Sequence, residues 1–283
     1  MKISKELVYT LWSGAIIVTV FLALIALIFS ACARQEPETA QTPAQTQQET
    51  PTANGDADAP QPEQEPQPEA TPEPVRLGET ADAGREYLDR VIFLGDSTTY
   101  GIGYYYTIGY QELCPPEQIW TPKSGTLTLS YQSIATVVYP ETDEELSIPE
   151  AAARAKPDIL IITLGVNGVS FMDEDFFIRE YSALVRSIQE ASPETKIILN
   201  SIYPVAASYR YQDDINNDKI RAANGWVERV AAETGCRFLY SFECLIGDDG
   251  SLPESSQNGD GIHLTGEAFT EVMHYIRTHA LPD

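Results

Sequence analysis

The sequence is poor in basic residues, in histidine and in cysteine, and each shortage excludes a class of protein. Lys and Arg number 18 against 42 Asp and Glu, which gives the 283 residues a formal net charge of -24. Such a chain repels phosphate backbones, so nucleic acid is excluded as a partner. Four cysteines are too few for a small disulfide-dependent domain. With three histidines and no Cys-x-x-Cys pair, the sequence offers no metal site, and no cofactor is expected.

The N-terminal segment is the longest stretch without charge. Residues 7–33 carry no charged side chain and follow two lysines. This run is long enough to span a bilayer, and the lysines favour a cytoplasmic N-terminus. It ends in Phe29–Cys32, which resembles the lipobox at which bacterial signal peptidase cuts before a lipidated cysteine. Residues 1–34 are therefore expected to anchor the chain to the outer face of a bacterial membrane, either as a transmembrane helix or through a lipid on Cys32.

Residues 35–75 contain proline, glutamine and acidic residues but no Lys, Arg or aromatic side chain. No hydrophobic core can form from this composition. Proline and like charges favour an extended, solvated chain, so the segment is predicted to be a disordered linker. Residues 76–283 keep a surplus of acidic side chains. This surplus suits neutral or cationic partners, and solubility outside the cell explains it equally well.

Apolar runs of strand length alternate with helical patterns in residues 76–283. Strands are predicted at 90–94, 118–120, 159–164, 196–202 and 237–240. Helices are predicted at 176–191, at 213–233 and from Thr265 onward, where threonine is a suitable N-cap residue. This alternation predicts an α/β fold, a three-layer α/β/α sandwich with a mainly parallel five-stranded sheet.

Three polar turns follow predicted strands or precede the last helix. Because open parallel sheets bind ligands at the carboxyl ends of their strands, these turns are candidate site residues. Gly95–Ser97 puts a serine hydroxyl at the start of a helix, and Gly165–Asn167 puts an amide side chain at the same end of the sheet. In Asp260–His263 the three-residue spacing lets the carboxylate reach the imidazole, which would fix the histidine tautomer.

In this order the turns resemble the sequence blocks of the SGNH hydrolases, also called the GDSL esterase family. Gly95–Ser97 matches the nucleophile block, Gly125 can match the glycine block, and Gly165–Asn167 matches the asparagine block. Asp260–His263 matches the Asp-x-x-His block, and the resemblance spans roughly residues 90–283. The ordered set is specific, whereas each block alone is also an ordinary turn or cap.

The resemblance implies a flavodoxin-like fold and a serine hydrolase that needs no cofactor. It implies Ser97 as nucleophile, His263 as general base and Asp260 as the group that orients the histidine. The Ser97 N–H, the Gly125 N–H and the Asn167 amide are implied as the donors of an oxyanion hole.

Two positions depart from the family pattern or leave it open. The family usually has aspartate after the asparagine, where this chain has Gly168. The glycine block has few distinctive residues, and spacing leaves Gly101, Gly103 and Gly109 as alternatives to Gly125.

Tyrosines crowd the segment after Ser97, at Tyr100, Tyr104, Tyr105, Tyr106 and Tyr110, with Trp120 beyond them. Two roles are open for rings such as Tyr100, Tyr104 and Tyr105. They stack on sugars or line an acyl pocket, or they pack in the core.

The cysteines leave two arrangements open. An extended strand between Cys236 and Cys244 would hold them too far apart for a disulfide, so Cys114 pairs with one of them or all three are free.

The sequence therefore predicts an exported, membrane-anchored serine esterase that works through an acyl-enzyme. The first substrate hypothesis is an O-acetyl group on cell-wall or extracellular polysaccharide. The alternatives are a lipase, lysophospholipase or thioesterase acting on longer acyl chains, and an acyltransferase that passes the acyl group to a sugar. An inactive surface-binding module is a further alternative, motivated by Gly168. The expected partners are an acyl ester or acylated glycan and the membrane.

Overall fold

The computed structural model describes residues 75–282. The predicted anchor at 1–34, including Cys32, and the predicted linker up to residue 74 lie outside this range. Within residues 75–282 no helix is long and apolar enough to cross a membrane.

Five parallel strands form the central sheet, in the spatial order β2-β1-β5-β6-β7. Their bounds are β1 (Val91–Gly95), β2 (Ile119–Trp120), β5 (Ile159–Thr163), β6 (Lys196–Asn200) and β7 (Arg237–Leu239). All five predicted strands are present, and the predicted five-stranded parallel sheet is confirmed.

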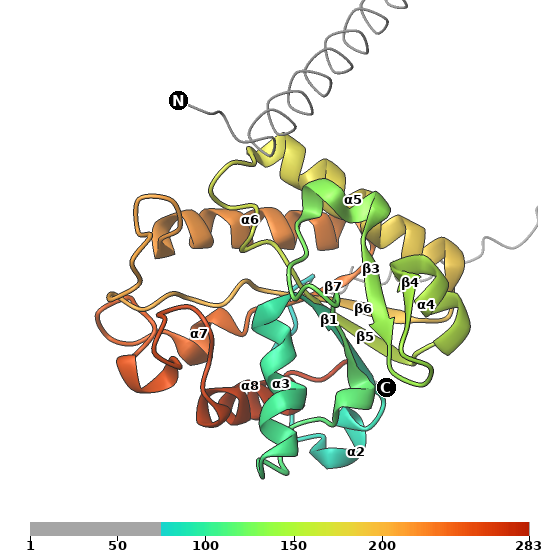
Figure 1. Cartoon of the computed structure of the whole chain (residues 1–283), viewed down its shortest axis with the longest axis horizontal. Coiled ribbons are helices and arrows are strands. Elements are labelled where there is room, and N and C mark those ends of the chain that lie inside the picture. The colour runs from blue at the N-terminus through green and yellow to red at the C-terminus, as the bar shows by residue number, and fades with distance from the viewer. Residues whose placement is uncertain (1–74, 283) are drawn as a thin grey trace, which may run out of the picture. The chain divides into compact units, whose positions relative to one another are not determined.

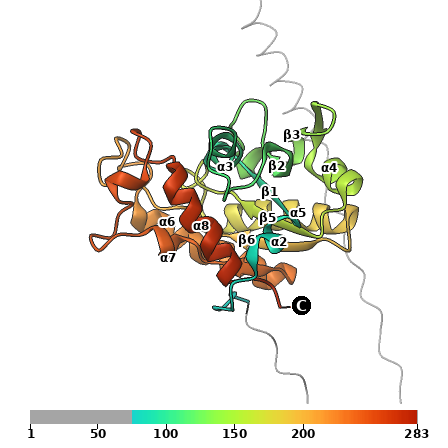
Figure 2. The ribbon, with the colours of Figure 1, turned by 90° about the horizontal axis from the view of Figure 1, so that it is seen from below.

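Helices cover both faces of the sheet, so the protein has three layers (Figures 1 and 2). Figure 1 shows α5 and α6 on one face and α3 and α8 on the other. The helices are α2 (Gly84–Leu88), α3 (Ser97–Thr107), α4 (Ile148–Ala155), α5 (Glu174–Ala191), α6 (Asn217–Thr234), α7 (Phe242–Leu245) and α8 (Gly266–Thr278). The predicted α/β/α sandwich is therefore confirmed.

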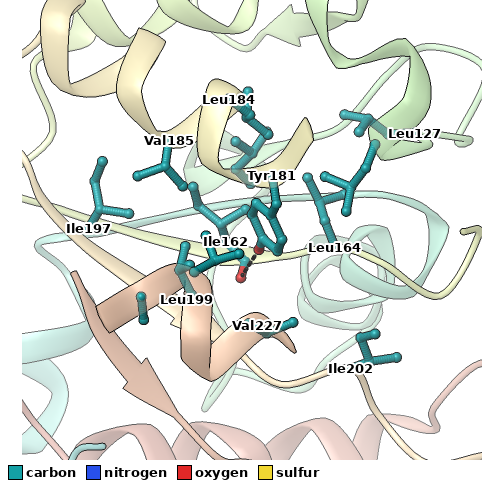
Figure 3. Packing of buried hydrophobic residues seen from close by; sticks show 14 of the residues in the cluster. Leu127, Ile162, Leu164, Tyr181, Leu184, Val185, Ile197, Leu199, Ile202 and Val227 are labelled. Atoms are coloured by element: carbon teal, nitrogen blue, oxygen red, sulfur yellow. Dashed lines mark hydrogen bonds between the residues drawn. The ribbon is translucent and has the colours of Figure 1, made fainter. Parts of the chain in front are cut away.

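Alternate side chains of the buried strands enter two cores, one on each face. Along β5, Leu160 and Ile162 pack in the core beneath α5 and α6, whereas Ile161 packs in the core beneath α8. Figure 3 shows the first core, where the Tyr181 hydroxyl donates a hydrogen bond to the Ile162 carbonyl at 3.3 Å. Because both faces are covered, the strands read as continuous apolar runs in the sequence.

The region between β2 and β5 contains elements that the sequence patterns did not predict. An antiparallel hairpin of β3 (Thr136–Tyr139) and β4 (Glu144–Ser147) follows the 3₁₀ helix η2 (Leu129–Ile134). The Ser147 side chain accepts from the N–H of Glu150, whose carboxylate accepts from the Ser147 N–H. This capping box starts α4 directly after the hairpin.

Two predicted boundaries are corrected by local hydrogen bonds. Helix α6 starts at Asn217 and not at residue 213, because the Asn216 side chain caps it by accepting from the Lys219 N–H. The predicted linker ends too late, because Val75 already pairs with β7: its carbonyl accepts from the Phe238 N–H at 2.9 Å. By contrast, the Thr265 side chain caps α8 as predicted.

Candidate active site

Ser97 lies where β1 ends and α3 begins, at the carboxyl edge of the sheet. Asp96 caps the helix, since its carboxylate accepts from the Thr98 N–H at 2.9 Å. The turn requires glycine before this cap, because a Cβ at Gly95 would lie 2.8 Å from the Thr163 carbonyl oxygen. The turn therefore holds Ser97 half-buried at the first position of a helix.

Two hydrogen bonds join Ser97, His263 and Asp260. The His263 Nε2 lies 2.9 Å from Ser97 Oγ, and the His263 Nδ1 lies 2.7 Å from Asp260 Oδ2. When Nδ1–H donates to the carboxylate, Nε2 is left as an acceptor for the serine proton. The fold thus brings together three side chains that the sequence singled out, across a separation of 166 residues between the serine and the histidine.

The Asp260 carboxylate is held in its charged form by the loop that carries it. Burial acts to raise the pKa of Asp260, but hydrogen bonds outweigh burial and lower that pKa. Oδ1 accepts from the N–H groups of Ile262 and His263, each at 3.0 Å, and Oδ2 faces the His263 ring. A carboxylate with a lowered pKa stays ionised opposite the imidazole, which is what orienting the ring requires.

Gln257 braces this loop, and the sequence analysis missed it. Its Oε1 accepts from the N–H groups of Gly259 at 2.5 Å and Gly261 at 2.9 Å, while its Nε2 donates to Glu254 at 2.9 Å. Both glycines have positive φ angles, of 115° and 85°. A glutamine in a polar loop carries no signal in a sequence, so only the folded loop reveals its role.

The Asn167 amide is tied to the residue that precedes Ser97. Asn167 Nδ2 donates to Asp96 Oδ2 at 2.8 Å and to the Leu127 carbonyl at 3.2 Å. The Ser97 N–H is at the first position of α3 and so has no acceptor within its own helix. Ser97 and Asn167, two of the predicted oxyanion donors, are thus linked through Asp96.

The Gly125 N–H does not fit the predicted role. It donates to the Pro122 carbonyl at 2.8 Å and is engaged within its own turn, where φ is 74°. The N–H groups of the alternative glycines are also engaged. Gly101 and Gly103 lie inside α3, where N–H groups donate to the preceding turn. The Gly109 N–H donates within the turn that ends α3, at 3.2 Å. The prediction of a Gly125 N–H donor is therefore corrected.

Gly168 stands where the family pattern has an aspartate next to the asparagine. A Cβ at Gly168 would lie 2.6 Å from the Met172 sulfur, so an aspartate here would require the methionine to move. The carboxylate that contacts Asn167 comes from Asp96, which lies 71 residues earlier in the chain.

Asp96 is a second site residue that the sequence analysis did not assign a role. Its side chain is completely buried, and this burial raises its pKa, although hydrogen bonds from Thr98 and Asn167 act in the opposite direction. Its place between Gly95 and Ser97 was the available signal.

Two hollows meet at Ser97. The larger, of ≈ 710 Å³, lies between α3 and the chain from the 3₁₀ helix η1 (Pro116–Gln118) to β3. The smaller, of ≈ 310 Å³, lies between α3 and the His263 loop. Tyr100 and Tyr104 line both hollows, and their exposed rings are stacked with centroids 6.5 Å apart.

The other aromatic residues of the predicted cluster have different surroundings. Tyr105 lines the smaller hollow. Tyr105, Tyr106 and Tyr110 are partly buried against the core, whereas Trp120 is fully buried. Some tyrosines of the cluster therefore border the space beside Ser97, and others pack against the core.

The cysteines of the described range are free thiols, namely Cys114, Cys236 and Cys244. The sequence argument assumed an extended chain from Cys236 to Cys244, and this was wrong, because Cys244 lies in the short helix α7.

Within residues 75–282 no cluster of three His, Cys, Asp or Glu side chains could hold a metal ion.

Comparison with known proteins gives one family. The model of the GDSL-like lipase/acylhydrolase family matches residues 93–269, more than half of the chain. None of the curated proteins matches the chain.

Several solved structures are similar to the chain at low identity. A GDSL-like lipase from Bacteroides thetaiotaomicron is 18% identical, with 70% of this chain and 89% of that chain covered and a TM-score of 0.49. An acetyl-xylooligosaccharide esterase from Geobacillus is 19% identical, with 74% and 97% covered and a TM-score of 0.43. The periplasmic domain of a lipopolysaccharide acetyltransferase from Salmonella Paratyphi A is 15% identical, with 72% and 84% covered and a TM-score of 0.42.

Proposed function

The chain belongs to the GDSL-like lipase/acylhydrolase family and is a carboxylic ester hydrolase, and we propose that it cleaves its ester through an acyl-enzyme on Ser97. The observation that carries this proposal is the pair of hydrogen bonds from Ser97 Oγ to His263 and from His263 to Asp260. A serine hydroxyl is a weak nucleophile until an oriented base takes its proton.

The proposed reaction has two balanced halves. In the first, Ser97 Oγ bonds to the ester carbonyl carbon as its proton passes to His263 Nε2. The bond from that carbon to the alcohol oxygen then breaks, and the departing alcohol takes the proton from His263. In the second half, water gives a proton to His263 and bonds to the same carbon, and Ser97 leaves with that proton. The products are a carboxylic acid, an alcohol and the free enzyme.

The oxyanion formed in each half needs donors. The Ser97 N–H is one donor, because it has no acceptor within its own helix. The second is the Asn167 amide, which donates to Asp96 and Leu127 in the described structure. For Asn167, one amide hydrogen would leave its present acceptor and turn to the substrate. Losing one such donor typically costs about 3 kcal/mol in the transition state.

We further propose that the esterase acts outside the cytoplasm, held to the membrane by residues 1–34. This rests on the uncharged run at 7–33 and the lipobox-like Phe29–Cys32 in the sequence. Intact mass of the membrane-extracted protein tests it, since a lipidated Cys32 start or an intact Met1 start with membrane retention is expected. A mature chain released without an anchor would contradict this part.

Two acyl groups are candidates for the substrate. An O-acetyl group on a polysaccharide is supported by the exposed Tyr100 and Tyr104 rings beside Ser97, because aromatic faces stack on sugars. A longer acyl chain is supported by the size of the larger hollow. Transfer to a sugar acceptor would use the same three residues, and products formed with an added acceptor would reveal it.

The test of the proposed function compares wild type with Ser97→Ala on p-nitrophenyl esters. Ser124→Ala is the matched control, because Ser124 is an exposed serine that lines the larger hollow. Ser97→Ala is expected to lose about 10³-fold or more in kcat, and Ser124→Ala less than threefold. Equal activity of Ser97→Ala and wild type would overturn the proposal.

A further inference from the structure

Helices α3 and α8 pack against each other on one face of the sheet (Figure 1). Ser97 is the first residue of α3, and α8 begins at Gly266, three residues after His263. The packing of these two helices therefore affects the distance between the serine and the histidine.

The first contact seats an aromatic ring of α8 on a glycine of α3. A Cβ at Gly101 would overlap the ring of Phe269, so the ring can approach only because Gly101 has no side chain. Gly101 comes four residues after Ser97, about one helical turn along the same face. The Phe269 ring is 1% exposed and lies beside the rings of Tyr105 and Tyr203, at centroid distances of 6.1 and 6.4 Å. It therefore has little room to turn away from α3.

The second contact seats an aromatic ring that follows α3 on the first residue of α8. A Cβ at Gly266 would lie 2.5 Å from Cζ of Tyr110. The Tyr110 hydroxyl donates to the Glu267 carboxylate at 2.6 Å, which holds the ring over the start of α8. Each side of the packing thus presents a glycine to an aromatic ring of the other side.

The two contacts lie at different points along α3, one near its beginning and one just beyond its end. Together they oppose both a shift and a tilt of this helix against α8. The Ser97 Oγ and His263 Nε2 atoms then keep their separation of 2.9 Å, the length of one hydrogen bond. Proton transfer needs that separation, since a base acts only within hydrogen-bond reach of the proton it takes.

We propose that this interlock, formed by Gly101 with Phe269 and by Gly266 with Tyr110, sets the distance between the Ser97 hydroxyl and the His263 ring. Phe269 and Tyr110 are positioning residues for the reaction. The inference rests on the proposed function, because the distance matters only if His263 takes the Ser97 proton. Gly101 and Phe269 also border the smaller hollow, so the test needs a readout that does not depend on ester binding.

The test uses the full chain and a substitution that fills the first contact. Gly101→Ala is expected to lower kcat about 10- to 100-fold, because the methyl group displaces Phe269 and with it the start of α8. Adding Phe269→Leu, which has a shorter side chain, is expected to restore kcat to within about fivefold of wild type. Gly225→Ala is the matched control and should keep the wild-type kcat, because Gly225 lies inside α6 and nothing stands within 4 Å of an added Cβ.

The rate of reaction with a fluorophosphonate gives the second readout. In this reaction the Ser97 oxygen bonds to phosphorus and fluoride leaves, so the rate reports on activation of the serine. It is expected to fall in Gly101→Ala and to recover in the double variant, in parallel with kcat. Both rates are measured well below the Tm of each variant, so that a loss of stability alone does not change them. If Gly101→Ala does not fold, Gly266→Ala with and without Tyr110→Leu makes the same comparison at the second contact.

The outcomes separate this proposal from the proposed function. A Gly101→Ala variant with wild-type kcat and labelling rate, even with a lower Tm, overturns the interlock while the esterase stands. A double variant no more active than Gly101→Ala overturns it as well. Activity that is unchanged in Ser97→Ala overturns the proposed function itself.

Discussion

The carboxylate of Asp96 accepts a hydrogen bond from the Asn167 amide at 2.8 Å, across 71 residues of sequence. Asp96 directly follows β1, and Asn167 lies in the turn after β5, the strand paired with β1. The contact therefore joins the two turns at the carboxyl edge of the sheet. It also fixes the Asn167 amide relative to Ser97, because Asp96 is the cap of the helix that Ser97 begins.

Asp96→Asn is expected to lower kcat by about 10- to 100-fold with little change in KM. The new amide nitrogen would face a donor on either side, the Asn167 amide or the Thr98 N–H, so Asn167 would lose its position in the proposed oxyanion hole. Steady-state kinetics on one ester measure this, with Asp89→Asn as the matched control because Asp89 is exposed and pairs with Arg85. A rise in KM at constant kcat would contradict a transition-state role.

Asn167→Ala is expected to lose about 10²- to 10³-fold in kcat, because the proposed oxyanion donor is removed. If Asp96 acts only through Asn167, then Asp96→Asn added to Asn167→Ala lowers kcat no further. A double-mutant cycle measures this coupling. Additive losses would mean that Asp96 serves Ser97 by another route, for example through the cap of α3.

In Asp260→Asn, the Tm is expected to fall less than the wild-type Tm as the pH is lowered. The pKa of Asp260 is lowered in the folded state, so its carboxylate stabilises the fold above the unfolded pKa of about 3.9, and that contribution is lost as pH falls through the lowered folded value. The Tm of wild type should therefore fall more steeply than that of the variant between about pH 5 and pH 2. Parallel Tm curves over this range would exclude the contribution of Asp260.

At neutral pH, Asp260→Asn should also lose about 10²-fold or more in kcat, because the His263 ring loses its charged partner.

Gln257→Ala is expected to lower kcat by about tenfold and to destabilise the fold by about 1–2 kcal/mol, because two loop N–H groups lose their acceptor. Gln257→Glu keeps an acceptor oxygen for these N–H groups but sets a second carboxylate against Glu254, to which Gln257 donates, so it should recover only part of the kcat. Kinetics and thermal unfolding together test this. A loss of stability with normal kcat would make Gln257 a structural residue only.

The sheet could be predicted because its strands are covered on both faces and so appear as continuous apolar runs. The run Ile159–Leu164 became β5 almost without change. The hairpin of β3 and β4 escaped prediction because each strand has only four residues and the second is mostly exposed, with Glu144 and Glu145. The second strand has neither an apolar run nor a clear alternation, and the first is too short for its pattern to stand out.

The candidate site was predictable where side chains carry the chemistry and not where backbone groups do. Ser97, Asp260 and His263 could be proposed from residue type and order, and the structure brings them within hydrogen-bond distance. The sequence could not show that the Gly125 N–H donates to the Pro122 carbonyl, because residue types alone do not fix backbone hydrogen bonds in a turn. Asp96 and Gln257 act by holding other groups, so their roles became visible only once their partners were in place.

The central claim is that Ser97 is an activated nucleophile, and reaction with a fluorophosphonate tests it most directly. The serine oxygen would bond to phosphorus as fluoride leaves, and peptide mass mapping would locate the adduct. The account predicts one adduct on Ser97, retained in Ser124→Ala and lost in His263→Ala. An adduct on another residue, or undiminished labelling of Ser97 in His263→Ala, would contradict it.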